Sequence, residues 1–201
     1  MIIQSNTKNP THAVIALHGR GGTAENILTI FADITKENSV KILAPQAQNN
    51  TWYPERFLVE QNKNEPWLSA SLSVVDEAVT AAMGEGVVHE NIVLAGFSQG
   101  ACLAAEYIKR NPKQYGGGVI MSGGIIGSDT EATTIIRKGS LAGTPIYLGC
   151  DNHDFHIPKE RVLLTEQVFT QLDAKITCRL YDNLGHTVHP EAIEFLSTLL
   201  T

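Results

Sequence analysis

Short apolar runs alternate with longer amphipathic segments along this chain, and this alternation limits the possible folds more than any other feature. The runs are apolar almost throughout, as expected for parallel strands that are buried under helices on both faces of a sheet. Six runs predict strands: Ala13–Leu17, Val40–Ala44, Ile92–Ala95, Gly118–Met121, Pro145–Leu148 and Ile176–Tyr181.

The segments between these runs have helical spacing and recognisable ends. Thr23 is suited to cap the first helix, with Asn26 in the position that completes a capping box. The predicted helices are Thr23–Ile34, Ser69–Met83, Ser98–Arg110, Pro158–Leu172 and Pro190–Leu200. Strand and helix alternate from end to end, which predicts one α/β domain over residues 1–201, with a mostly parallel sheet flanked by helices on both faces.

Composition narrows the class of partner. The chain has 201 residues, a formal net charge of -6 and no basic run, so we expect no nucleic-acid binding. No apolar run approaches the roughly 18 residues that a membrane helix needs, so we expect no membrane insertion. The amino terminus lacks a signal-peptide pattern, and Cys102, Cys150 and Cys178 are typical of free thiols. These features predict a cytoplasmic protein.

Two long connections follow predicted strands. Residues 46–66 form a link of about 20 residues, which is long for a compact domain. Residues 122–144 form another, within which residues 129–138 could hold a short helix. Because ligands bind at the carboxyl ends of the strands in open α/β sheets, we expect both connections near a functional site.

A strand-to-helix junction carries the strongest chemical signal. The sequence Gly96-Phe97-Ser98-Gln99-Gly100 matches G-x-S-x-G, directly after one predicted strand and directly before a predicted helix. In this motif the serine sits on a tight turn that exposes its hydroxyl, and the glycines allow close backbone packing. The pattern predicts Ser98 as a nucleophile, against the alternative of a glycine-rich turn capped by serine.

A serine nucleophile needs a histidine base within hydrogen-bond reach. Four histidines follow the serine in sequence: His153, His156, His186 and His189. Among them, His186 follows Gly185 just after the last predicted strand, where a loop can return over the end of the sheet. We therefore predict His186 as the base, with His189 as the alternative.

The acid that orients the base should follow the strand that ends at Leu148. Asp151 and Asp154 both lie there, and the residues alone do not separate them. Asp182 is less suited, because it precedes the predicted base by only four residues in the same loop.

An oxyanion hole requires two backbone N–H groups. We expect one of these N–H groups from Gln99, the residue after the serine, and the other from Arg20, in the glycine-rich loop after the first strand. We expect the Arg20 side chain to pair with Glu55 rather than with a substrate, and His18 to bind its own loop. Three aromatic residues are either substrate-binding residues or anchors of the long loop: Trp52, Tyr53 and Phe57.

With these motifs in place, the sequence resembles the phospholipase/carboxylesterase family, which includes acyl-protein thioesterases. Asp154-Phe155-His156-Ile157-Pro158 is similar to the family's D-P-x-[VI]-P segment, although Phe155 replaces the usual proline. The resemblance favours Asp154 over Asp151. Arg20 stands where thioesterase members often carry an apolar residue, and Trp52–Phe57 resembles a W-Y-P-x-R-F segment of bacterial members.

The resemblance implies an α/β-hydrolase fold without a lid domain. It also implies a serine hydrolase that cleaves esters or thioesters of small acyl groups through a Ser98–His186–Asp154 triad, with no cofactor. A homodimer is compatible with it.

Two other classes of function remain open. Several metal-ligand residue types lie in two loops, which would suit a metal-dependent hydrolase or a metal-binding protein, although their spacing matches no ligand motif. These residues are Asp151, His153, Asp154, His156, His186 and His189. The other class is a binding protein without catalysis on a hydrolase scaffold.

Overall fold

A seven-stranded sheet runs through the molecule, in the strand order β1-β3-β2-β4-β5-β6-β7. The computed structural model describes residues 2–4, 7–31 and 39–201. The strands are β1 Ile2–Gln4, β2 His12–Leu17, β3 Val40–Pro45, β4 Ile92–Phe97, β5 Gly117–Met121, β6 Pro145–Asp151 and β7 Lys175–Tyr181. The α-helices are α1 Ala24–Ile30, α2 Trp67–Gly84, α3 Gln99–Arg110, α4 Asp129–Thr133, α5 Lys159–Gln171 and α6 Pro190–Thr198. Strands β2 to β7 pair in parallel, which confirms the predicted mostly parallel sheet.

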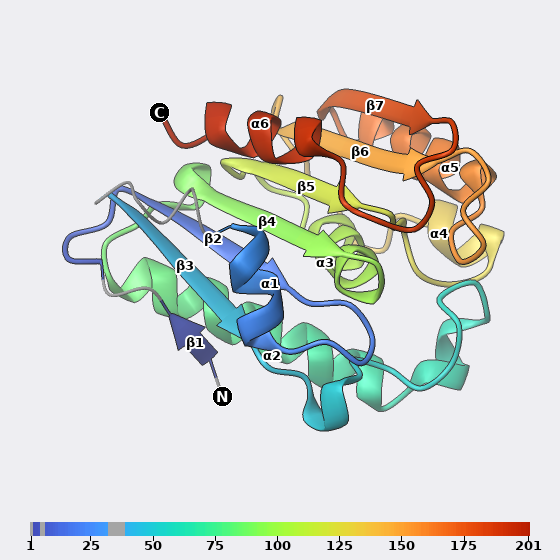
Figure 1. Ribbon diagram of the computed structural model, residues 1–201, viewed down its shortest axis with the longest axis horizontal. Helices are drawn as coiled ribbons and strands as arrows, with labels where there is room; N and C mark the ends of the chain where they lie inside the picture. Colours follow the sequence, from blue (N-terminus) through green and yellow to red (C-terminus); the bar gives the residue numbers. More distant parts are fainter. Residues whose placement is uncertain (1, 5–6, 32–38) are drawn as a thin grey trace.

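Helices cover both faces of this sheet, as the continuous apolar runs predicted (Figure 1). Alternate residues of β2 point to opposite faces, so Ile15 and Leu17 join one buried cluster while Val14 and Ala16 join another. The first cluster includes side chains of α2, α3 and α5, and the second includes side chains of α1 and α6. Every side chain from Ala13 to Leu17 is buried, which explains why polar residues are excluded from this run.

The helix ends follow local chemistry. Thr23 caps α1 by accepting a hydrogen bond from the backbone N–H of Asn26, and the Asn26 side chain accepts one from the backbone N–H of Thr23. The predicted end of this helix, residues 32–34, lies outside the described residues. Helix α2 begins at Trp67, earlier than predicted, because the Pro66 carbonyl already accepts the N–H of Ala70 and closes the first turn.

Strand β1 was not predicted. It has three residues and pairs antiparallel with β3, with Ile2 opposite Pro45. Such a short segment shows no periodicity that a sequence pattern could reveal. The two long connections contain only short elements: η2 Gln48–Asn50 and η3 Gln61–Asn64 in the first, and α4 in the second.

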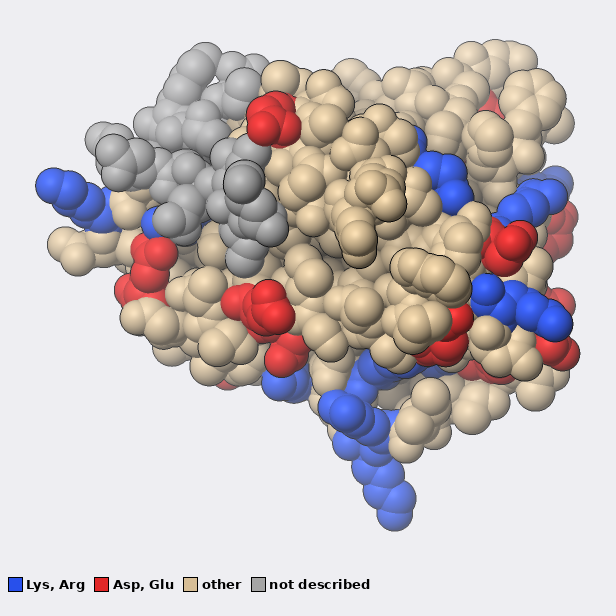
Figure 2. Space-filling model, turned by 90° about the horizontal axis from the view of Figure 1, so that it is seen from below, with Lys and Arg blue, Asp and Glu red and all other residues tan. Residues whose placement is uncertain are grey.

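The carboxyl ends of the parallel strands lie at one edge of the sheet (Figure 1). The segments that carry the predicted site residues after β2, β4 and β6 leave the sheet at this edge. On the face seen in Figure 2, acidic and basic side chains are interspersed with a larger area of uncharged residues. Within the described part of the chain, no helix is long and apolar enough to cross a membrane.

Candidate active site

Ser98 occupies the turn that joins β4 to α3. Its φ of 54° and ψ of −119° lie in a region that residues with a Cβ rarely adopt. The backbone N–H of Ser98 donates to the Met121 carbonyl of β5 at 2.9 Å, and its carbonyl accepts the N–H of Cys102 at 3.0 Å. A Cβ on Gly96 would lie 2.5 Å from the carbonyl of Gly100, so the turn needs these glycines. The sheet and the helix together hold the serine in its strained conformation.

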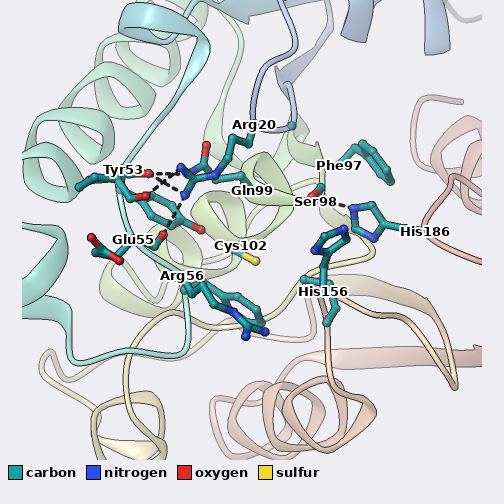
Figure 3. A pocket seen from close by; sticks show the side chains of 14 residues that line it. Arg20, Tyr53, Glu55, Arg56, Phe97, Ser98, Gln99, Cys102, His156 and His186 are labelled. Atoms are coloured by element: carbon teal, nitrogen blue, oxygen red, sulfur yellow. Dashed lines mark hydrogen bonds between the residues drawn. The ribbon is translucent and has the colours of Figure 1, made fainter.

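Ser98, His186 and Asp154 form a continuous chain of hydrogen-bonding side chains. His186 Nε2 lies 2.8 Å from Ser98 Oγ (Figure 3), and His186 Nδ1 lies 2.7 Å from Asp154 Oδ2. Desolvation raises the pKa of Asp154, but hydrogen bonds from His186 and from the backbone of His156 and Ile157 outweigh it and lower this pKa. An ionised Asp154 can only accept, so Nδ1 carries the proton and Nε2 can accept from the serine hydroxyl.

Asp151 holds the loop that presents His186. Its buried carboxylate accepts hydrogen bonds from the backbone N–H groups of Leu184, Gly185 and His153. Gly185 has a φ of 72°, which a side chain would disfavour. Of the two carboxylates that the sequence left open, Asp154 contacts the imidazole and Asp151 fixes the backbone next to it.

The alternative residues have other contacts. The ring of His189 stacks on Tyr181 with ring centroids 4.0 Å apart, and its Nδ1 accepts the backbone N–H of Glu191 at 3.1 Å. Asp182 accepts a hydrogen bond from the Asn152 side chain at 2.8 Å. The structure therefore brings His186 and Asp154 to the serine, and leaves His189 and Asp182 in other hydrogen bonds.

His18 organises the loop after β2, as expected. Its Nδ1 lies 2.7 Å from the Gly19 carbonyl, and its Nε2 accepts the backbone N–H of Ala47 at 3.1 Å. Desolvation is the main cause that lowers the pKa of His18, which favours this neutral ring. Trp52 donates its indole N–H to the His18 carbonyl at 2.8 Å and is buried there, which explains its place in the core.

Two backbone donors flank the serine. The N–H of Gln99 is at the first position of α3, and the N–H of Arg20 is in the loop after β2. Across residues 7–31 and 39–201 neither N–H has a hydrogen-bond acceptor. The Gln99 side chain is engaged, because it accepts the N–H of Trp52 and donates to the carbonyl of Tyr53. Both N–H groups are therefore available to a negatively charged oxygen, which the helix N-terminus also favours.

A cavity of about 460 Å³ opens beside Ser98 (Figure 3). Tyr53 and Phe57, which the sequence left open as substrate-binding residues or anchors of the long loop, line it, and both are also buried in the core. Trp52, the third of these aromatic residues, lies in the same core but does not line this cavity.

The Arg20 side chain fixes one wall of the cavity. Its guanidinium donates to three successive carbonyls, those of Tyr53, Pro54 and Glu55, at 2.8 to 2.9 Å. Among the described residues, the expected charge pair with the Glu55 carboxylate is not formed; the planar fork of the guanidinium instead spans adjacent backbone oxygens, including that of Glu55. This clamp holds the long loop against the loop after β2.

Several lining residues were not predicted. The ring centroid of Phe97 lies 5.0 Å from that of His186, and the ring centroid of His156 lies 4.8 Å from it. Cys102 is buried in the core and also contributes to the lining. Desolvation raises the pKa of Cys102 to about 12, so its thiol stays protonated. The spacing of Cys102, one helical turn after Ser98, is the signal that could have indicated its position. Arg56 also lines the cavity and was not predicted.

The two loops that carry the candidate metal ligands do not form a metal site in the described part of the chain. Among the described residues, no group of three or more His, Cys, Asp or Glu side chains is arranged to hold a metal ion. The side chains that the alternative requires instead bind backbone N–H groups, as Asp151 and His189 do, or other rings, as His156 does.

Comparison with known proteins gives a consistent result. The sequence profile of the phospholipase/carboxylesterase family matches residues 1–201. A crystal structure of a phospholipase/carboxylesterase from Dyadobacter fermentans is 36% identical, with a TM-score of 0.91 over 100% of this chain and 96% of that chain. Acyl-protein thioesterase 1 of Gibberella zeae is 23% identical over 94% of this chain and 89% of its own length. A probable carboxylesterase SOBER1-like of Arabidopsis thaliana is 27% identical over 93% of this chain and 77% of its own length.

Proposed function

Since the chain belongs to the phospholipase/carboxylesterase family and is an α/β-hydrolase, we propose that it hydrolyses esters or thioesters of small acyl groups, with Ser98 as nucleophile. The observation that carries the proposal is the contact chain from Ser98 Oγ through His186 to Asp154. A serine hydroxyl becomes nucleophilic when a neutral imidazole can take its proton.

The reaction follows from this geometry in two halves. Ser98 Oγ attacks the carbonyl carbon while His186 Nε2 takes its proton, and Asp154 stabilises the imidazolium that forms. The N–H groups of Arg20 and Gln99 stabilise the oxyanion. His186 then protonates the leaving alcohol or thiol, which leaves an acyl-enzyme. A water molecule, deprotonated by His186, attacks this acyl-enzyme and releases the acid and free Ser98.

The size of the cavity supports a small substrate. A volume of about 460 Å³ is at the small end of ligand pockets in general. Gly19 supports close approach to the nucleophile, because a Cβ there would lie 3.4 Å from the Ser98 Cβ. Because residue 19 has no side chain, the acyl group of a substrate can come close to Ser98 and to the backbone N–H groups of Arg20 and Gln99.

The location of the protein is also part of the proposal. Cys102, Cys150 and Cys178 are free thiols, and two of them are buried. Free thiols are typical of a reducing compartment, which supports a cytoplasmic enzyme.

The test is hydrolysis of p-nitrophenyl esters from acetate to palmitate by the wild type, Ser98→Ala and Ser73→Ala. Ser73 is an exposed serine on α2, so its variant controls for loss of a hydroxyl. We expect turnover that is highest on short acyl chains, is lost in Ser98→Ala and is kept in Ser73→Ala. Turnover that persists in Ser98→Ala would reject Ser98 as the nucleophile. A butyryl thioester measured beside the butyryl ester compares thiol and alcohol leaving groups.

A further inference from the structure

Arg56 differs from every other arginine in the chain. The guanidinium groups of the others each donate a hydrogen bond to an acceptor in the protein: Arg20, Arg110, Arg137, Arg161 and Arg179. The exposed Arg56 guanidinium has no such acceptor among the described residues, yet Arg56 lines the cavity beside Ser98. A cation at a cavity wall without a protein partner is available to a ligand.

The backbone that carries Arg56 is fixed on both sides. The carbonyl of Arg56 accepts the side-chain amide of buried Asn64 at 3.3 Å, and the same side chain accepts the N–H of Glu55 at 2.8 Å. The next residue, Phe57, is buried, and its carbonyl accepts the N–H of Gly127 at 2.8 Å. The base of the Arg56 side chain is therefore held in place before a substrate arrives, which lowers the entropic cost of binding.

The charges around the cavity leave Arg56 as the available cation. Arg20 is positively charged, but its guanidinium is occupied by three backbone carbonyls. Glu55 is the acidic residue in the lining, and in Figure 3 its carboxylate points away from Ser98, whereas Arg56 lies between Glu55 and His156. A guanidinium suits a carboxylate, because its planar fork can donate two parallel hydrogen bonds to the two oxygens.

We propose that Arg56 binds a carboxylate carried by the substrate, so that the enzyme prefers short esters that bear a second, anionic end. This inference rests on the proposed esterase function and adds the substrate class to it. The carboxylate can belong to the acyl part, as in a half-ester of a short dicarboxylic acid, or to the alcohol part, as in an acyl ester of a short hydroxy acid. Arg56 takes no part in bond making or breaking.

The experiment compares anionic esters with neutral esters of the same shape. For the acyl side, monomethyl adipate is paired with methyl 6-methylheptanoate; for the alcohol side, 3-acetoxypropanoate is paired with isopentyl acetate, so that an isopropyl group replaces the carboxylate in each pair. Hydrolysis is measured by pH-stat titration of the acid released. The quantity compared is the ratio of kcat/KM for the anionic ester to kcat/KM for its neutral partner. The ratio is obtained for the wild type, Arg56→Gln and Lys63→Gln. Lys63 is an exposed cation in η3 of the same loop and does not line the cavity, so it controls for net charge.

We expect the ratio to fall by roughly tenfold in Arg56→Gln for one of the two ester pairs. A hydrogen bond between a guanidinium and a carboxylate is strong, but solvent weakens it here because Arg56 is exposed. The pair that responds identifies the part of the substrate that carries the carboxylate. The ratio should stay unchanged in Lys63→Gln, and the difference between wild type and Arg56→Gln should shrink as salt is added.

Equal ratios in the wild type and Arg56→Gln for both pairs, with neutral esters hydrolysed, would overturn the role of Arg56 and leave the esterase function intact. Binding of adipate to Ser98→Ala, measured by titration calorimetry, tests the contact between Arg56 and a carboxylate without catalysis. Adipate should bind Ser98→Ala more tightly than Ser98→Ala/Arg56→Gln. Equal affinities would exclude a carboxylate on the acyl part, whereas absence of ester turnover in the wild type would count against the esterase function alone.

Discussion

The carbonyl oxygen of Leu17, at the end of β2, lies so close to Gly100 in the first turn of α3 that a Cβ on Gly100 would be 2.2 Å from it. The obstacle is the backbone of a central strand, which cannot rotate aside as a side chain can. This contact sets how closely the helix approaches the sheet and therefore where Ser98 stands above it.

We predict that Gly100→Ala lowers the free energy of unfolding by about 3 kcal/mol or more, measured by urea denaturation. Gly84→Ala is the control, because a Cβ at Gly84 meets no heavy atom within 4 Å at the end of α2. That variant should be more stable than the wild type by roughly 0.5 to 1 kcal/mol. A Gly100→Ala protein of wild-type stability would contradict the close packing of the elbow.

The strained backbone of Ser98 gives a second prediction. With φ at 54°, a glycine at this position avoids strain that any residue with a Cβ keeps. Ser98→Gly and Ser98→Ala both lose the hydroxyl contact with His186, so their difference isolates the backbone. We expect Ser98→Gly to be more stable than Ser98→Ala by about 1 kcal/mol, after allowing for the greater entropy of glycine in the unfolded chain. Thermal unfolding of both variants measures this, and a more stable Ser98→Ala would argue against strain.

The two aspartates after β6 should differ in kinetics. Asp154 contacts the imidazole of His186, so Asp154→Asn disfavours the tautomer that can accept the serine proton and should lower kcat by roughly 10³- to 10⁴-fold. Asp151 binds backbone N–H groups, so Asp151→Asn should lower kcat less than about a hundredfold through displacement of the loop. Steady-state kinetics on one ester compares them. A larger loss in Asp151→Asn would exchange the two roles.

Asp151 also predicts how stability depends on pH. Backbone hydrogen bonds from His153 and Gly185 are the main causes that lower the pKa of Asp151 in the folded protein. A lowered folded-state pKa stabilises the protein above the ordinary aspartate pKa of about 3.9, and this stabilisation is lost as pH falls through the folded-state value. The stability difference between wild type and Asp151→Asn should therefore be constant near neutral pH and shrink below about pH 4. A difference that grows on acidification would contradict this assignment.

The sequence predicted a site residue best where the chemistry requires one residue type at a fixed position relative to a strand or helix. Ser98 joins the end of the central strand β4 to the start of α3, and His186 follows the last strand, β7, so the position of each residue in the topology could be predicted. Asp151 and Asp154 both follow β6, and only the three-dimensional path of the loop decides which carboxylate faces the imidazole. The family resemblance, and not the residues alone, favoured Asp154.

The cavity wall was harder to predict, because it comes from the long connection after β3. Residues close in sequence there have different surroundings: Trp52 lies in the core away from the cavity, Tyr53 lies in the core and lines the cavity, and Arg56 is exposed at it. Their positions depend on contacts with distant segments, such as the Arg20 clamp and the Asn64 amide. Neither contact has a periodicity or a motif that a sequence pattern could reveal.

The central claim is that Ser98 is an activated nucleophile, and covalent labelling tests it most directly. The wild type, Ser98→Ala and His186→Ala are treated with a fluorophosphonate, and the adduct is located by peptide mass spectrometry. We predict one adduct per chain on Ser98 in the wild type, none in Ser98→Ala, and labelling slowed by orders of magnitude in His186→Ala. A folded wild type that remains unlabelled, or an adduct on another residue, would contradict the account.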